Sequence, residues 1–265
     1  MKKIQIYFLI FGIFFIAFVF IMATCQEYLK NLDNLPTIVG VFFLFLFVFV
    51  ILYLETRDSL RKKAIKEYCE KNGLEYLDSV DSLPEIADFK ILHKGYEGKN
   101  EYHALMRGQR DDISFTLLDY SYVQSCGNND GVFNVSLCIL SKADMQFPDM
   151  ILDEKLPLLA GTIDQALMAQ SGKNIVKSIG DSTFENKFSL VSTDAKAVKE
   201  YFKSGVIDAF LKNYIKGCRY DACDDSLTIA HLGFFHYGIK QRLEMLKKGI
   251  ALISEIDKAR KAVLG

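Results

Sequence analysis

The sequence IYFLIFGIFFIAFVFIMAT runs from Ile6 to Thr24, and IVGVFFLFLFVFVILYL runs from Ile38 to Leu54; neither contains Asp, Glu, Lys or Arg. As α-helices, these segments of 19 and 17 residues would be about 28 and 26 Å long, close to the hydrocarbon thickness of a bilayer. A core helix of a globular domain seldom stays apolar on every face for five turns. The segments therefore predict a transmembrane helical hairpin over residues 1–54, ahead of a soluble domain over residues 55–265.

Basic residues on the flanks predict the orientation of this hairpin. Lys2 and Lys3 precede the first segment, whereas the hinge between the segments, residues 25–37, holds only Lys30 against two carboxylates. The basic residues that follow the second segment are Arg57, Arg61, Lys62, Lys63 and Lys66. The positive-inside rule then places both termini in the cytoplasm. The sequence therefore predicts a multi-pass protein of the cell (inner) membrane with a cytoplasmic domain.

A cleaved signal peptide is the rival interpretation of the N-terminus. The first apolar run is longer than a typical signal core, and no A-x-A cleavage site follows it. Met22-Ala23-Thr24-Cys25 is similar to a lipoprotein box, but Thr24 stands where a small Gly or Ala is required. Lipidation of Cys25 is kept as a minor alternative.

The domain is close to electrically neutral. Residues 55–265 contain 29 of the 32 basic and 31 of the 33 acidic residues, and no basic tract lies outside the membrane flank. A nucleic-acid partner would require a basic face to offset the phosphate charge. We therefore expect no nucleic-acid partner.

Hydrophobic patterning predicts an α+β domain with a mainly antiparallel sheet covered by helices. Strands are expected at 74–78, 89–94, 102–106, 113–123, 132–140 and 188–192, with a hairpin at 219–232 that turns at Asp224-Asp225. Helices are expected at 57–72, 155–170, 194–215 and 239–263, with a bend or break at Gly205 in the third of these. The Gly127–Gly131 tract joins two long strands and is typical of a hairpin loop.

Several short motifs, in order, resemble a family of uncharacterised bacterial membrane proteins with an N-terminal two-helix transmembrane hairpin and a cytoplasmic α+β domain. The motifs are Gly108, Phe115 with Leu118-Asp119-Tyr120-Ser121-Tyr122, Phe147-Pro148 with Leu152 and Glu154, and Phe184 and Phe188 ahead of Ser192-Thr193-Asp194 with Val198 and Phe202. The resemblance implies this architecture and location, and it implies no catalytic residues.

Asp119 is the carboxylate with the strongest claim to a site. Strand alternation places it on the same face as Phe115 and Leu117, and a buried carboxylate must find donors. Arg107 and His103 complete the candidate catalytic set. The alternative is a structural carboxylate that pairs with Arg107 or Arg110, and we favour this alternative.

No metal or cofactor site is expected. Cys218, Cys223, His231 and His236 are the one set that resembles metal ligands, but the four residues between the cysteines do not match the usual zinc spacings. No phosphate loop, nucleophile elbow or H-E-x-x-H pair is present in the sequence.

These observations favour an interaction or regulatory module held at the inner membrane, and whether the protein is an enzyme stays open. The alternatives are a membrane-surface enzyme with an active site that matches no motif, and a lipid- or small-ligand-binding domain. The expected partners are the lipid bilayer, a cytoplasmic protein and a second copy of the chain. A homodimer could use the apolar seam formed by Ile239, Leu243, Leu246, Ile250 and Ile253. The simpler expectation is that this seam packs on its own domain.

Overall fold

The computed structural model describes residues 35–83, 101–126, 129–155, 173–176, 178–203, 205–233 and 236–264. The first predicted span, the strand expected at 89–94 and the helix expected at 155–170, apart from Lys155, lie outside these residues. By its contacts the chain divides into two units, Met1–Ala64 and Ile65–Gly265, which are taken separately below.

Helix α3, Leu35–Asn72, contains the second apolar segment and the basic helix that follows it. In the first unit its large apolar side chains are exposed, for example Phe43 and Phe47 at 60% and 63%. Asp58 accepts a hydrogen bond from Arg61 Nη2 at 2.7 Å. The helical prediction for the second apolar segment and for residues 57–72 is confirmed. Within the part of the chain that the structure describes, no helix is found to have the length and hydropathy needed to cross a membrane.

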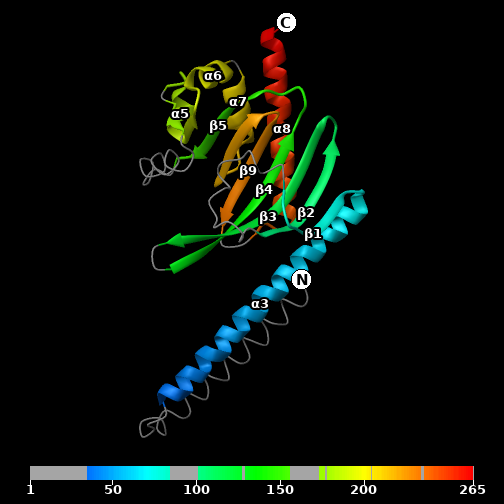
Figure 1. Cartoon of the computed structure of the whole chain (residues 1–265), viewed down its shortest axis with the longest axis vertical. Coiled ribbons are helices and arrows are strands. Elements are labelled where there is room, and N and C mark those ends of the chain that lie inside the picture. The colour runs from blue at the N-terminus through cyan, green and yellow to red at the C-terminus, as the bar shows by residue number, and fades with distance from the viewer. Residues whose placement is uncertain are drawn as a thin grey trace. The chain divides into compact units, whose positions relative to one another are not determined.

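The second unit is built on a nine-stranded sheet in the order β1-β2-β3-β4-β9-β8-β5-β7-β6 (Figure 1). Each neighbouring pair in this sheet is antiparallel, as expected. The strands are β1 Glu75–Val80, β2 Glu101–Arg110, β3 Ile113–Cys126, β4 Asn129–Ser141, β5 Phe147–Glu154, β6 Asn174–Ile175, β7 Phe188–Ser192, β8 Cys218–Asp224 and β9 Ser226–Gly233.

The two predicted hairpins form the middle of the sheet. Strands β3 and β4 pair from Ser114–Ser141 to Cys126–Asn129, and β8 and β9 pair on either side of Asp225. Asp224 takes the left-handed conformation at φ 51°, which Asp tolerates better than most residues. Strand β5 was not predicted, because Pro148 and three acidic residues disguise its alternation. Pro148 is the second residue of the strand, near the end where a missing N–H is best tolerated.

Short helices cover one end of the sheet in Figure 1: α5 Ser182–Lys187, α6 Ala195–Tyr201 and α7 Val206–Asn213. The single helix expected at 194–215 is divided into α6 and α7. Gly205 precedes α7 with φ at 79°, a conformation that glycine adopts without a steric penalty. The predicted cap at Asp194 is confirmed, because its carboxylate accepts from Lys196 N and Ala197 N at 2.9 Å.

Helix α8, Ile239–Leu264, packs on the sheet and on α7. The larger of the two clusters of buried apolar residues, the main core, includes Leu246 and Ile253. The other three members of the predicted seam are half-buried against this core. Packing of this helix on its own domain is therefore confirmed. Gly249 sets how closely the helix approaches the sheet, since a Cβ there would lie 2.4 Å from Leu140 Cδ1.

The opposite face of the sheet carries a second, smaller core that includes Leu118 and Tyr120. Tyr102, Tyr120, Tyr122 and Phe133 form a continuous ladder of stacked rings across β2, β3 and β4. Adjacent ring centroids are 5.2 to 5.3 Å apart. Stacked cross-strand aromatic pairs stabilise a sheet register beyond their area burial.

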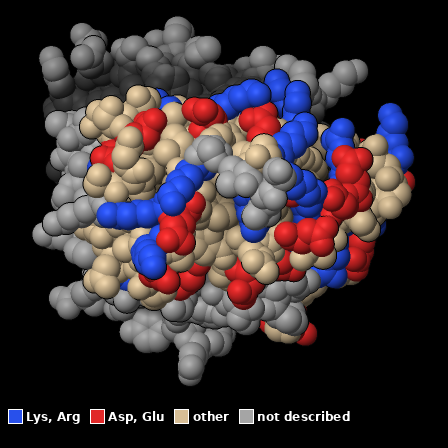
Figure 2. Space-filling view, turned by 90° about the horizontal axis from the view of Figure 1, so that it is seen from above, with Lys and Arg blue, Asp and Glu red and all other residues tan. Residues whose placement is uncertain are grey.

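Charged side chains of both signs are mixed over the face of the molecule shown in Figure 2. Cross-element ion pairs of the second unit include Arg219 with Asp153 at 2.5 Å and Lys212 with Glu255 at 2.6 Å. The near-neutral charge of the sequence is thus distributed as a mixture of signs on this face.

Candidate functional site

A row of polar and ionisable side chains crosses the face of the sheet that carries the main core. One residue comes from each of five adjacent strands, and each lies directly opposite its neighbour in the register. Directly opposed residues project from the same face. In order, the row is His103, Asp119, Ser136, His231 and Cys218.

Asp119, the second residue of this row, is fully buried. Its Oδ1 lies 2.5 Å from Arg242 Nη2 and accepts a hydrogen bond from Ser136 Oγ at 3.3 Å. Arg242, at the start of α8, is 1% exposed and also donates from Nη1 to Ala104 O at 2.7 Å. Ala104 has φ at 48° within an irregularity of β2, between His103 and Met106. A buried ion pair with these extra hydrogen bonds is costly to break at either partner.

The segment before α8 closes over the row. Tyr237 N donates to Ser136 Oγ at 2.8 Å, and the Tyr237 ring stacks on His231 with centroids 4.2 Å apart. Burial raises the pKa of the Cys218 thiol to about 12 and lowers the pKa of His231. Both groups are therefore held in their neutral forms near pH 7.

Ser121, His236 and Asp119 form an array that meets the row at Asp119. Ser121 Oγ lies 3.2 Å from His236 Nε2, and His236 Nδ1 lies 3.4 Å from Asp119 Oδ1. A serine, a histidine and a buried carboxylate in this order are the parts of a nucleophile–base arrangement. Two contacts differ from a hydrolase: Ser121 Oγ also donates to Asn134 Oδ1 at 3.0 Å, and Arg242 shares the carboxylate.

The structure separates the three candidates predicted from the sequence. The prediction that Asp119 shares a face with Phe115 and Leu117 is confirmed, since both belong to the main core. His103 lies opposite Asp119 in the register, and its Nε2 is 3.1 Å from Glu101 Oε2. Arg107 is on the other face, where it lies opposite Thr116 and donates to Thr116 Oγ1 at 3.4 Å.

The guanidinium that pairs with Asp119 therefore comes from Arg242, where Arg107 or Arg110 was expected. Arg242 was not predicted to belong to a site. The signal that could have found it is its position: Arg242 precedes the buried pair Met245 and Leu246 by one helical turn. Among the described residues, no group of three or more His, Cys, Asp or Glu side chains is arranged to hold a metal ion.

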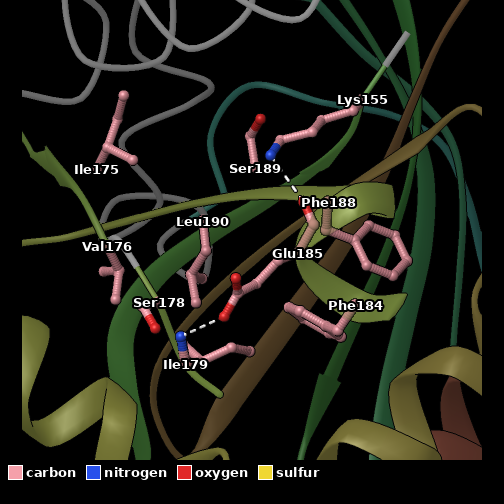
Figure 3. Close-up of a pocket in the computed structure, with 10 residues that line it drawn as sticks. All are labelled: Lys155, Ile175, Val176, Ser178, Ile179, Phe184, Glu185, Phe188, Ser189 and Leu190. Atoms are coloured by element: carbon pink, nitrogen blue, oxygen red, sulfur yellow. Dashed lines mark hydrogen bonds between the residues drawn. The ribbon is translucent and has the colours of Figure 1, made fainter. Parts of the chain in front are cut away.

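A pocket of about 290 Å³ lies apart from this row, beside β7 and α5 (Figure 3). Its walls are mainly apolar, and its polar lining comes from Lys155, Ser178, Glu185 and Ser189. The apolar lining residues are Ile175, Val176, Ile179, Phe184, Phe188 and Leu190. The volume is at the lower end of the range of small-molecule sites.

Comparison with known proteins gives limited information. No protein-family model and no curated protein matches the chain, so the family suggested by the short motifs remains a resemblance. One solved structure is similar, the mycobacterial trehalose monomycolate transport factor A, TtfA, with a TM-score of 0.49 and 10% identity over 74% of this chain and 93% of that one. A similarity of this degree carries no argument about function.

Proposed function

We propose that the chain is a membrane-anchored module, with residues 1–54 as a transmembrane hairpin and the Ile65–Gly265 unit as a cytoplasmic interaction or regulatory domain. The observation that carries the proposal is the composition of α3. From Ile38 to Leu54 the helix has no charged residue and exposes large apolar side chains, which is unfavourable in water. Residues 1–34 lie outside the described chain, so the first span rests on the sequence.

The same helix supports a domain held close to the bilayer. Basic residues follow Leu54 directly, and Ile65 and Cys69 of α3 are fully buried in the core of the second unit. Only eleven residue steps of sequence separate Leu54 from Ile65. Anionic head groups would attract the basic residues in between.

Reporter fusions test this topology. A reporter that is active only outside the cytoplasm should be active when fused after residue 30 and inactive when fused after residue 265. Resistance of the full chain to carbonate extraction provides an independent measurement. Activity of the same reporter at residue 265 would overturn the orientation, and release by carbonate would overturn the anchor.

A second candidate function, hydrolysis of an ester or activated acyl group at the membrane surface, is favoured by the Ser121–His236–Asp119 array. Ser121 Oγ would attack the acyl carbon while His236 takes its proton, and the leaving group would depart from the acyl carbon with that proton. Water, deprotonated by His236, would then attack the acyl-serine ester, release the carboxylic acid and restore the serine hydroxyl. A fluorophosphonate probe should label the wild-type chain at Ser121 and fail to label Ser121→Ala. An unlabelled wild-type chain would eliminate this candidate and leave the module.

Partner binding is part of the primary proposal. Affinity purification of the full chain in a mild detergent should recover a cytoplasmic protein. Since part of the apolar seam of α8 is used within its own domain, we expect a homodimer to need a different surface. Sedimentation of the purified chain measures that state directly.

A further inference from the structure

The pocket beside β7 contains a buried hydroxyl whose hydrogen-bonding capacity is unused. Ser189 is 2% exposed, and its Oγ has no hydrogen-bond partner among the described residues. Its neighbour Ser192, on the same strand, donates to Asp149 O at 2.7 Å. An unsatisfied buried hydroxyl costs free energy, so such groups usually have a partner that is absent from the protein itself.

Lys155 supplies the only positive charge among the residues that line this pocket. Its Nζ donates to the backbone carbonyl of Glu185 at 2.7 Å, and no carboxylate lies within ion-pair distance among the described residues. The two buried lysines of the described chain behave differently: Lys142 and Lys173 pair with Asp257 and Asp149, respectively. An ammonium has three donors, so Lys155 retains capacity for an anionic acceptor.

The Glu185 carboxylate also lines the pocket, but it is already engaged. Its Oε1 accepts from Ile179 N at 2.7 Å and from Gly180 N at 2.9 Å. Figure 3 shows this carboxylate turned toward Ile179, whereas the Lys155 ammonium and the Ser189 hydroxyl occupy another part of the lining. Lys155 Nζ and Ser189 Oγ can still donate hydrogen bonds, whereas the Glu185 carboxylate already accepts two. The pocket should therefore prefer an anion at Lys155.

The framework of the pocket is fixed by strand pairing and a capped helix. Strand β6 pairs with β7 through Asn174–Ser192 and Ile175–Val191, and Val176 N donates to Leu190 O at 2.8 Å. The side chain of Asp181 caps α5 by accepting from Phe184 N at 2.8 Å. A preformed cavity of this kind binds a ligand without a large ordering cost.

We propose that this pocket binds a small amphiphilic carboxylate, with its two oxygens at Lys155 Nζ and Ser189 Oγ and its apolar chain against Phe184, Phe188 and Leu190. Two donors match the two oxygens of a carboxylate, and the apolar walls match a short alkyl chain. The site is distinct from the row around Asp119 and does not depend on the membrane anchor.

Octanoate is the probe, with octan-1-ol as the uncharged molecule of the same chain length. The full chain is reconstituted in phosphatidylcholine nanodiscs, and calorimetric titrations are corrected with empty nanodiscs. Octanoate should bind saturably, Lys155→Met should weaken it about tenfold or more, and Ser189→Ala should weaken it severalfold. Lys196→Met, at an exposed position of α6, should leave octanoate binding unchanged. The affinity for octan-1-ol should be equal in wild type and Lys155→Met.

A diazirine derivative of octanoate locates the site on the wild-type chain without any substitution. Mass spectrometry should find the label on peptides that contain residues 175–190. The proposal is overturned if octanoate shows no saturable binding above empty nanodiscs, if Lys155→Met and Lys196→Met bind it equally well, or if the label lies elsewhere.

Discussion

The surroundings of Asp119 and the pocket around Ser189 both contain a hydroxyl and a cationic side chain, but they differ in how these groups are paired. Around Asp119 the carboxylate meets Arg242 and Ser136, and Arg242 meets a backbone carbonyl as well. In the pocket, Ser189 has no partner among the described residues and Lys155 has no carboxylate there. The pairing of Asp119 with Arg242 and Ser136 indicates a carboxylate that holds the fold together. The unused donor capacity of Lys155 and Ser189 supports a place for a molecule that is not part of the chain.

The largest expected effect comes from breaking the Asp119–Arg242 pair. Asp119→Leu or Arg242→Met leaves the other charge buried and uncompensated, so each should lower the free energy of unfolding by about 3–5 kcal/mol. The double variant should lose much less than the sum. Urea denaturation of the full chain in mild detergent measures both. Additive losses would mean that the two charges do not stabilise each other.

A smaller effect is expected from displacing α8, which carries Arg242. In Gly249→Ala the new Cβ would lie 2.4 Å from Leu140 Cδ1 and 3.0 Å from Ile229 Cδ1, so either these two buried side chains or the helix must shift. Overpacking of this kind costs about 1–3 kcal/mol, and the higher helix propensity of Ala recovers about 1 kcal/mol. The comparison variant is Lys247→Ala, on the exposed side of α8, which should be neutral. A melting temperature for Gly249→Ala above that of the wild type, as the helix propensity of Ala alone would give, would contradict the close approach.

The pH dependence of stability tests the polar row, because His231 is half-buried there. Burial lowers its pKa below the ordinary value of 6.5, so the unfolded chain binds the proton first as the pH falls. Its contribution to stability is therefore complete above about pH 6.5 and is lost as the pH falls through the lower folded pKa. His231→Phe, which keeps the stacking on Tyr237, should show a shallower loss of stability between pH 7.5 and 5. Identical slopes for the two proteins would show that His231 titrates normally.

The smallest effect is expected at Ser189, and a matched serine provides its control. Ser189→Ala removes a hydroxyl that has no hydrogen-bond partner in the described part of the chain, so the free energy of unfolding should change by less than about 0.5 kcal/mol or increase. Ser136→Ala removes a group that donates to Asp119 and accepts from Tyr237 N, so it should cost about 1–2 kcal/mol. Equal losses of stability for Ser189→Ala and Ser136→Ala would mean that the two hydroxyls are equally well paired.

The parts of the fold that the sequence predicts correctly are those with local signals. The hairpin across Gly127–Gly131, strand β7, the Asp194 cap and the last helix each follow from residues that are close together in the chain. Strand β5 was not predicted, because Pro148 and the acidic residues of this segment interrupt its apolar alternation. In the structure it is stabilised by pairing with β7 on one side and β8 on the other.

The candidate sites depend on contacts that are distant in the sequence. Asp119 and its burial can be inferred from alternation, but Arg242 lies far along the chain on a helix where most charged residues face solvent. His236 joins the array through its contact with Ser121, which is 115 residues away. The unused hydroxyl of Ser189 has no sequence signal at all, since the state of a serine depends on what its neighbours leave unpaired.

The ladder of stacked rings across β2, β3 and β4 has a consequence for spectroscopy. The chain contains no Trp, so its near-ultraviolet absorption comes from 13 Tyr and 21 Phe residues. Tyr102, Tyr120 and Tyr122 hold their rings nearly parallel, with interplanar angles of 21° and 23°. Transitions on chromophores this close couple with a fixed handedness, so near-ultraviolet circular dichroism should be dominated by these three side chains. That signal reports on the packing of β2 against β3. If this part of the sheet unfolds before the rest, the near-ultraviolet signal should disappear while other strands remain folded.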